Sequence, residues 1–384
     1  MADDPTRLKM DEIDWGTTLF LLLSPAAAIV AVVFYVLHAG FHPADGAIFA
    51  ASYILCGLAI TGGYHRLWAH GTYKCHAAIR VGYLGFGAAA LQTPVLNWAA
   101  NHRYHHQFVD HDGDPYNATR GFFFAHMGWI FHRDRPGREF SNAKDLKRDR
   151  LVMWQSRYYW PLAAIFGFGL PTLAGWAFGR PLGGFLWGGL LRVVALHHAT
   201  FMINSVAHYF GSKPYTLADT SHNNRWLAFL ALGEGLHNFH HAFAGDYRSS
   251  LHWYQWDPTK WWIRSLRSVG LARDLRTVPE RLILQATMAT ALQTAGPALE
   301  RLPIDRRREV DALLEDCQER FDTALAAYVE QRAAYREWLD APDVPKGWAR
   351  RREQARRARS LLVTWRTADR ARRAYLKTLR RTAR

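Results

Sequence analysis

Long uncharged stretches alternate with polar segments along the chain. Residues 17–37, 46–64 and 159–178 contain no Asp, Glu, Lys or Arg, and residues 183–206 contain only Arg192. Each stretch has about 20 residues, the length that an α-helix needs to cross a hydrocarbon core of roughly 30 Å. The pattern therefore predicts an all-α integral membrane protein with four transmembrane helices in two hairpins.

Basic residues indicate which side of the membrane the polar segments face. The short loops within the two hairpins carry one Lys or Arg between them, whereas the segment between the hairpins is rich in both. Because positively charged loops tend to stay in the cytoplasm, we expect both termini and this long segment to be cytoplasmic. The chain would then be a multi-pass protein of a bacterial inner membrane or an equivalent membrane.

Histidines gather in three short motifs beside the predicted spans. HRLWAH begins at His65, HRYHH at His102 and HNFHH at His237, and His208 follows Asn204 by four residues at the end of the last stretch. In HRYHH and HNFHH the histidines stand at positions i, i+3 and i+4, which share one face of a helix. Neutral imidazole is a common metal ligand, and this supply suffices for two metal ions.

One further uncharged stretch, residues 81–100, is also long enough to cross a membrane. If it crossed, the motif at His102 would face the opposite side from the motif at His65. We therefore interpret residues 81–100 as a re-entrant or interfacial helix whose polar groups are satisfied against protein. All the histidine motifs then meet in a cytoplasmic helical cap on a membrane domain that covers residues 1–275.

The number of histidines narrows the choice of metal more than their type does. Imidazole suits iron, zinc and copper, but a single zinc site uses only three or four protein ligands. The three cysteines form no CxxC pair, which disfavours an iron-sulfur centre. The Glu-x-x-His pairs of soluble carboxylate di-iron proteins are missing at these motifs. A histidine-rich pair of irons favours dioxygen activation and removal of hydrogen from an unactivated carbon of a lipid-like substrate.

The residues from 276 to 384 form a separate, helical extension. Residues 279–340 predict one or two helices with a break at Leu302 and Pro303, and the chain is strongly basic from residue 345 onward. Apolar residues recur at helical spacing among the arginines, as in helices that lie on anionic membrane surfaces. A solvated helical extension is the alternative, and nucleic acid is not an expected partner.

Several runs of sequence are specific when they occur together. They are GYHRLWAH, NHRYHHQF, the segments Asp112–Trp129, Asp145–Tyr159 and Asn204–Gly211, and GEGLHNFHHAF. With these runs the chain resembles the membrane-bound fatty acyl desaturases of the stearoyl-CoA type over roughly residues 13–275. The resemblance implies a mushroom-shaped protein with four spans and a cytoplasmic cap. It also implies insertion of a cis double bond, usually between the ninth and tenth carbons of an acyl chain.

The resemblance also assigns roles to residues. It places Gln92, Trp98 and Thr200 near the bend of an acyl tunnel, and makes Arg133 and Arg135 candidates for the anionic head of the substrate. Asn204 would hold one of two iron ions through a water. The implied metal ligands are His65, His70, His102, His105, His106, His208, His237, His240 and His241.

The substrate carrier and the electron source are less defined. Ala100 and Asn101 stand where the animal enzymes carry Arg and Asp, and Asp134 replaces a lysine. The acyl group is therefore expected on coenzyme A, with a phospholipid or a carrier protein as alternatives. Because the chain has neither an HPGG haem motif nor a GxGxxG loop, we expect an external donor such as a ferredoxin or rubredoxin with its reductase.

Two other functions fit the same motifs. A di-iron fatty acyl hydroxylase or alkane monooxygenase uses similar histidine sets and differs in the step after the first hydrogen abstraction. A non-redox, histidine-rich metal-binding membrane protein would also explain the ligand clusters.

Overall fold

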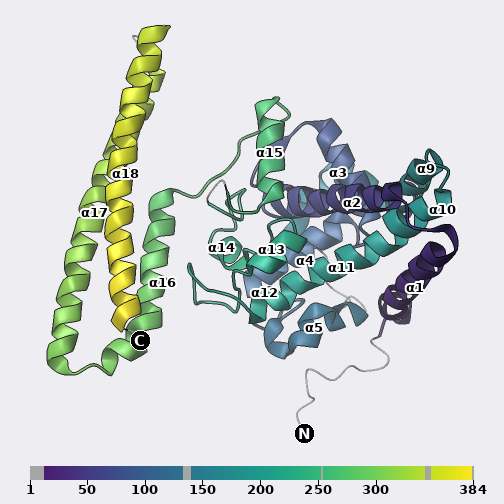
Figure 1. Cartoon of the computed structure of the whole chain (residues 1–384), viewed down its shortest axis with the longest axis horizontal. Helices are drawn as coiled ribbons and strands as arrows, with labels where there is room; N and C mark the ends of the chain where they lie inside the picture. The colour runs from purple at the N-terminus through teal and green to yellow at the C-terminus, as the bar shows by residue number, and fades with distance from the viewer. Residues whose placement is uncertain (1–12, 133–139, 252–253, 342–346, 383–384) are drawn as a thin grey trace. The chain divides into compact units, whose positions relative to one another are not determined.

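The computed structural model describes residues 13–132, 140–251, 254–341 and 347–382. Its regular structure is helical apart from two short paired strands, β1 (Lys74–Cys75) and β2 (Ala272–Arg273) (Figure 1). Two compact units divide the chain, Met1–Val278 and Pro279–Arg384.

Within the described residues, three helical stretches are long and apolar enough to cross a membrane: Trp15–Ala39, Pro43–Ala69 and Pro181–Tyr209. The first is α1 (Trp15–Ala39), and the second joins α2 (Pro43–Leu58) to the π-helix η2 (Ala59–Ala69). The third joins α10 (Pro181–Gly183), η7 (Gly184–Leu191), α11 (Arg192–Asn204) and α12 (Val206–Tyr209).

The remaining expected span, residues 159–178, is helical but is not among those three. It consists of α8 (Tyr159–Ala164), η6 (Ile165–Gly169) and α9 (Leu170–Trp176). It packs closely against η7, where a Cβ on Gly184 would clash with the carbonyl oxygen of Pro171. The helical hairpin is therefore present, while the arrangement with four membrane crossings stays a prediction.

Residues 81–100, expected as one re-entrant or interfacial helix, are divided between two helices, and their re-entrant or interfacial position stays a prediction. The two helices are α3 (Ala77–Ala89) and α4 (Val95–Phe108). Leu91 and Thr93, between them, have φ values of 54° and 76°, a region that interrupts a right-handed helix. Pro94 then precedes the first turn of α4, a position that tolerates its missing N–H. The break turns α4 to carry His102, His105 and His106 towards η2.

Shorter elements complete the first unit and position the remaining histidines. Its main core cluster joins η2, α3, α4 and α15 around Tyr64, Leu84, Val95 and Ile263. The remaining helices are η3 (Ala118–Arg120), α5 (Phe122–His126), η4 (Gly128–Phe131), η5 (Ser141–Ala143), α6 (Lys144–Lys147), α7 (Arg150–Arg157), α13 (Arg225–Leu230), α14 (His237–Ala242) and α15 (Pro258–Ser268).

The second unit is built from three helices, α16 (Glu280–Glu300), α17 (Ile304–Asp340) and α18 (Trp348–Thr382). The chain leaves the helical conformation around Pro303, as expected for a proline that cannot continue a helix. One core cluster joins all three helices, with Met288 on α16, Phe321 on α17 and Tyr375 on α18. The unit therefore has a hydrophobic core of its own.

Candidate metal centre

Eight of the nine expected histidine ligands form two groups within the described residues. In each group, one ring nitrogen per histidine lies within 4.8 Å of the others. His106 adjoins the first group, because its Nε2 lies 2.8 Å from Nε2 of His240. The first group contains His65, His70, His102 and His240, and the second contains His105, His208, His237 and His241.

The π-helix η2 explains how His65 and His70 reach the same group. The N–H of His70 donates to the carbonyl oxygen of His65 at 3.1 Å, which is the i to i+5 hydrogen bond of a π-helix. This bond brings residues five apart close together on one side of the helix, and the two ring centroids are 4.9 Å apart. On a regular α-helix the same two side chains would diverge.

The histidines face one another through the same ring nitrogen. The Nε2 to Nε2 distances are 2.8 Å between His70 and His102 and between His106 and His240, 3.0 Å between His65 and His240 and between His237 and His241, 3.1 Å between His208 and His237, and 3.2 Å between His105 and His241.

Such contacts fit a cation placed among the nitrogen atoms. Nδ1 of His105 lies 2.9 and 3.0 Å from the two carboxylate oxygens of Asp114. A carboxylate can only accept, so Nδ1 carries the proton and Nε2 of His105 presents a lone pair. The Nε2 lone pair of His105 is therefore available to a metal ion.

The closest Nε2 pairs lie at separations found between ligands of one metal ion. Two imidazoles bound at about 2.1 Å and at right angles are roughly 3.0 Å apart, whereas tetrahedral ligands would be roughly 3.4 Å apart. The six closest Nε2 pairs lie 2.8 to 3.2 Å apart, and the ligand atoms of each group all lie within 4.8 Å of one another. With His106, the first group also offers five imidazoles, one more than tetrahedral zinc uses. The two groups could each hold a metal ion.

Burial favours the neutral imidazoles that metal binding requires. Removal from water is the largest cause that lowers the pKa, and repulsion from neighbouring histidines adds to it. The histidines outside the spans whose pKa is lowered well below its usual value in this way are His70, His102, His106, His237, His240 and His241.

Carboxylates and hydroxyls behind the histidines hold the rings in place. Nδ1 of His65 lies 3.0 Å from Oε2 of Glu234. Burial raises the pKa of the Glu234 carboxyl, but Arg66 and His65 outweigh it, and the pKa falls to about 2. Arg66 in turn donates to Asp257 at 3.0 Å. These buried contacts keep Glu234 ionised and aligned with His65.

The second group has similar support. Nδ1 of His208 lies 2.8 Å from Oγ1 of Thr220, and this hydroxyl donates to Asp110 at 2.7 Å. Sequence reasoning did not assign roles to Asp114 and Glu234. The available signal was their position inside the runs Asp112–Trp129 and Gly233–Phe243.

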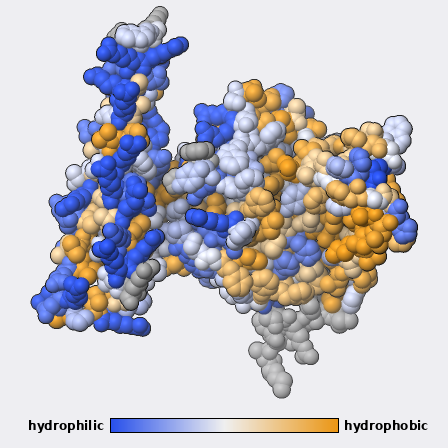
Figure 2. All heavy atoms as spheres, viewed as in Figure 1, coloured by the Kyte–Doolittle hydropathy of each residue, from blue (hydrophilic) through white to orange (hydrophobic). Residues whose placement is uncertain are grey.

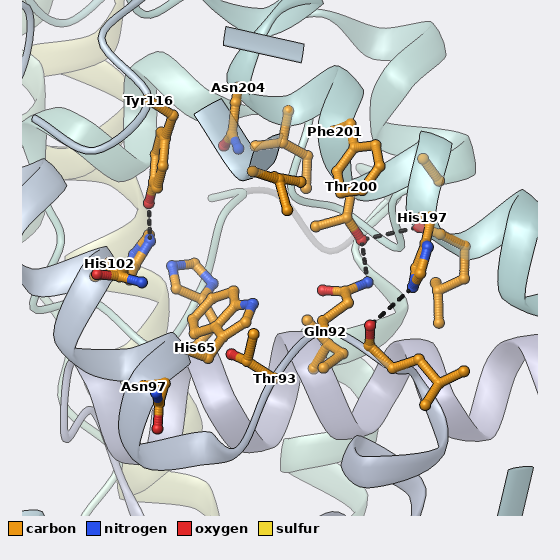
Figure 3. A pocket seen from close by; sticks show the side chains of 18 of the residues that line it. His65, Gln92, Thr93, Asn97, His102, Tyr116, His197, Thr200, Phe201 and Asn204 are labelled. Carbon is orange, nitrogen blue, oxygen red and sulfur yellow. Dashed lines mark hydrogen bonds between the residues drawn. The ribbon is translucent and has the colours of Figure 1, made fainter. Parts of the chain in front are cut away.

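A cavity of about 810 Å³ adjoins the histidines. His65, His102, His105 and His237 line it together with mostly apolar side chains, and Figure 3 shows part of this lining. The expected ligand Asn204, at the end of α11, also lines this cavity. An elongated apolar substrate could therefore reach the metal-binding groups from within the protein.

The three residues expected near the tunnel bend all line this cavity. The amide of Gln92 donates to the hydroxyl of Thr200 at 2.9 Å, which joins the break before α4 to helix α11 (Figure 3). The indole of Trp98 stacks on His102 with 5.1 Å between ring centroids. Arg133 and Arg135, expected at the substrate head, lie outside the described residues.

The described residues thus combine helices of membrane-spanning length with two largely buried histidine groups that could hold metal ions and an adjoining cavity, the features of a membrane metalloprotein. The sequence comparisons identify the family within this class. The family model "Fatty acid desaturase" matches residues 45–268, so the chain belongs to the fatty acid desaturase family.

Curated relatives have consistent names. The chain is 39% identical over 263 residues to "Probable acyl-CoA desaturase" of Schizosaccharomyces pombe, covering 66% of this chain and 55% of that protein. "Acyl-CoA desaturase 1" of Saccharomyces cerevisiae is 39% identical, with 66% and 52% covered. "Delta(9)-fatty-acid desaturase fat-7" of Caenorhabditis elegans is 39% identical, with 71% and 82% covered. The chain thus spans about half the length of the two yeast relatives.

Proposed function

We propose that this protein is a fatty acyl desaturase that inserts a cis double bond between the ninth and tenth carbons of a long saturated acyl chain. The observation that carries the proposal is the pair of histidine groups, with Nε2 atoms facing one another, beside an apolar cavity of about 810 Å³. The relatives' names support acyl-CoA as the substrate. An acyl-phospholipid or an acyl-carrier protein is the alternative carrier.

The reaction is balanced by dioxygen and an external donor. Two hydrogens leave neighbouring carbons, and dioxygen takes these hydrogens, two electrons and two protons to form two waters. Two iron ions held by the histidine groups would supply the dioxygen chemistry. A ferredoxin or rubredoxin with its reductase would supply the electrons.

The chain's own residues determine where the reaction occurs. The apolar walls of the cavity exclude water from the acyl chain. The pair Gln92 and Thr200 fixes the wall beside the acyl chain, so one pair of methylene groups faces the histidines. Asn204 would hold one iron through a water, and Arg133 and Arg135 would bind the anionic head.

The proposed location is a membrane with both termini in the cytoplasm, held by four spans beneath a cytoplasmic cap. Three of these spans correspond to helices of sufficient length and apolarity among the described residues. We propose a bacterial inner membrane or an equivalent one, although the relatives named above are eukaryotic.

Expression in a host that cannot make unsaturated fatty acids tests the function. Mass spectrometry of the host lipids should show a new monounsaturated chain with the parent protein. It should show none with His105→Ala or His240→Ala, which remove one ligand from each group. His111→Ala is the matched control, because His111 is exposed and lies outside both groups.

The same experiment separates the alternatives. An alcohol without an alkene would identify a hydroxylase or alkane monooxygenase. Lipid profiles that do not change with the protein, together with iron bound by the parent chain and lost in His105→Ala, would identify a non-redox metal-binding protein.

A further inference from the structure

Helix α18 carries a continuous row of cations on one side. The positions of this row alternate steps of four and three residues, so successive charges are about 5 Å apart along the axis. Only Val363 interrupts it, and every position is exposed. We call this row the arginine stripe; it consists of Arg352, Arg356, Arg359, Arg366, Arg370, Arg373, Lys377 and Arg380.

Most of the stripe has no counter-charge on the protein. Arg356 pairs with Glu353 and Arg373 pairs with Asp369, and these are the acidic residues of α18. The stripe residues that make no ion pair within the described part of the chain are Arg352, Arg359, Arg366, Arg370, Lys377 and Arg380. Figure 2 shows strongly hydrophilic residues over the visible side of this unit.

The apolar side of α18 is already covered. Ala368, Tyr375 and Leu379 are buried in the core shared with α16 and α17, and Trp365 packs against it. The helix therefore cannot lay this apolar face into a membrane, as the sequence pattern had indicated, without leaving its own bundle. What it presents to a partner is charge, over about 42 Å of helix from Arg352 to Arg380, along a row that turns by about 80° around the helix.

We propose that the arginine stripe docks the C-terminal unit on the anionic headgroups of the membrane that holds the first unit. A layer of negative headgroups complements a long row of cations on one side of a helix. An anionic lipid surface is favoured as the partner because the chain connects the two units directly. Residue 279 follows a unit with helices of membrane-spanning length. The link keeps the effective concentration of lipid headgroups near the stripe high.

The docking would be electrostatic and reversible. Each arginine near an anionic surface raises the affinity about fivefold. Salt screens the attraction beyond about 10 Å at 0.1 M ionic strength. No step of the proposed desaturase reaction depends on it, so the activity and the docking can be tested separately.

The test uses the full chain in lipid nanodiscs. Val363→Cys places a donor fluorophore in the stripe, on a residue that is 61% exposed, and acceptor fluorophores are attached to lipid headgroups. The parent chain, labelled in the same way, gives the background from its three native cysteines. Energy transfer from position 363 should be high in discs that contain phosphatidylserine. It should be low in purely zwitterionic discs and in 0.5 M salt, a condition expected to screen the attraction almost completely.

Two charge variants of the labelled chain then show whether docking depends on the arginine stripe. Arg359→Gln, Arg366→Gln and Arg370→Gln together should weaken docking on the order of 100-fold, measured from transfer against the phosphatidylserine fraction. The matched control removes three exposed arginines from α17 instead, Arg306→Gln, Arg308→Gln and Arg320→Gln, and should dock like the parent.

The proposal is overturned if transfer is equal in anionic and zwitterionic discs, or if both variants lose it equally. Docking that requires an added acidic protein or a DNA duplex, with no response to lipid charge, would also overturn it and would assign the stripe to that partner.

Discussion

Asp114 fixes the proton of His105 and thereby directs the lone pair of that ring towards the second histidine group. The carboxylate also accepts from the backbone N–H groups of Asp110 and Tyr116, so it is held on both oxygens. We expect Asp114→Asn to weaken iron binding about 10- to 100-fold, since loss of such a supporting group typically has this effect. Iron titration against a chelator measures it.

Asp112→Asn serves as the control for this change, because Asp112 is exposed and lies on the same loop. Equal iron affinity in Asp114→Asn and Asp112→Asn would show that the carboxylate does not orient His105.

A substitution at Thr200 tests whether the hydrogen bond between Gln92 and Thr200 shapes the cavity wall. Thr200→Val keeps the shape of the side chain but removes the acceptor for the amide of Gln92. A lost buried hydrogen bond costs about 1 kcal/mol, so we expect kcat/KM for the acyl substrate to fall roughly fivefold and the double-bond position to become less uniform. Gas chromatography of the products measures both.

Thr172→Val is the comparison for that variant, since the Thr172 hydroxyl donates to its own helix at Phe168 and does not line the cavity. If the two valine variants behaved alike, the pair of Gln92 and Thr200 would have no specific role.

At single positions the sequence indicated the candidate ligands that the structure brings together, but not the side chains that contact them. The histidine motifs can be recognised from the spacing of their residues along the sequence. Eight of the nine expected ligands lie in the two groups. Glu234 and Asp257 contact Arg66 from positions at least 168 residues away. Their roles depend on tertiary contacts, which cannot be recognised from the spacing of residues along the sequence.

At the scale of elements, Arg192 shows why the helix breaks were not predictable. Its position inside an apolar stretch marks it as unusual, but the sequence does not show its partners. The guanidinium donates to the carbonyl oxygens of Ala89, Gly167 and Gly188, and so joins the end of α3 to η6 and η7. Carbonyls freed by a helix end and by π-helices need such a partner.

We expect Arg192→Met to destabilise the first unit by roughly 3 kcal/mol, because it leaves buried carbonyl oxygens without a donor. Thermal unfolding, followed by size-exclusion chromatography, measures the loss. Arg192→Lys should lose less, since the ammonium keeps donors and charge in the same place. An unchanged unfolding temperature in Arg192→Met would mean that other groups satisfy these carbonyls.

At the scale of the whole molecule, the composition of the sequence predicted a separate C-terminal extension. It did not predict how the helices of this extension pack. The charge run from residue 345 onward indicated a surface helix. Its apolar positions instead face residues of α16 and α17 that lie about 50 to 90 residues earlier, such as Met288 and Phe321. A pattern of apolar residues shows that a helix face is covered, but not whether protein or lipid covers it.

Because each unit has its own core, the catalytic groups should survive removal of the second. Every histidine of the two groups and every residue that lines the cavity belongs to the first unit. A chain that ends at Val278 is expected to bind iron as the full chain does and to keep its desaturase activity within about twofold in a zwitterionic membrane. Iron content and product formation in nanodiscs test this. If the shortened chain binds iron normally but makes no alkene, the C-terminal unit must take part in electron delivery or substrate entry.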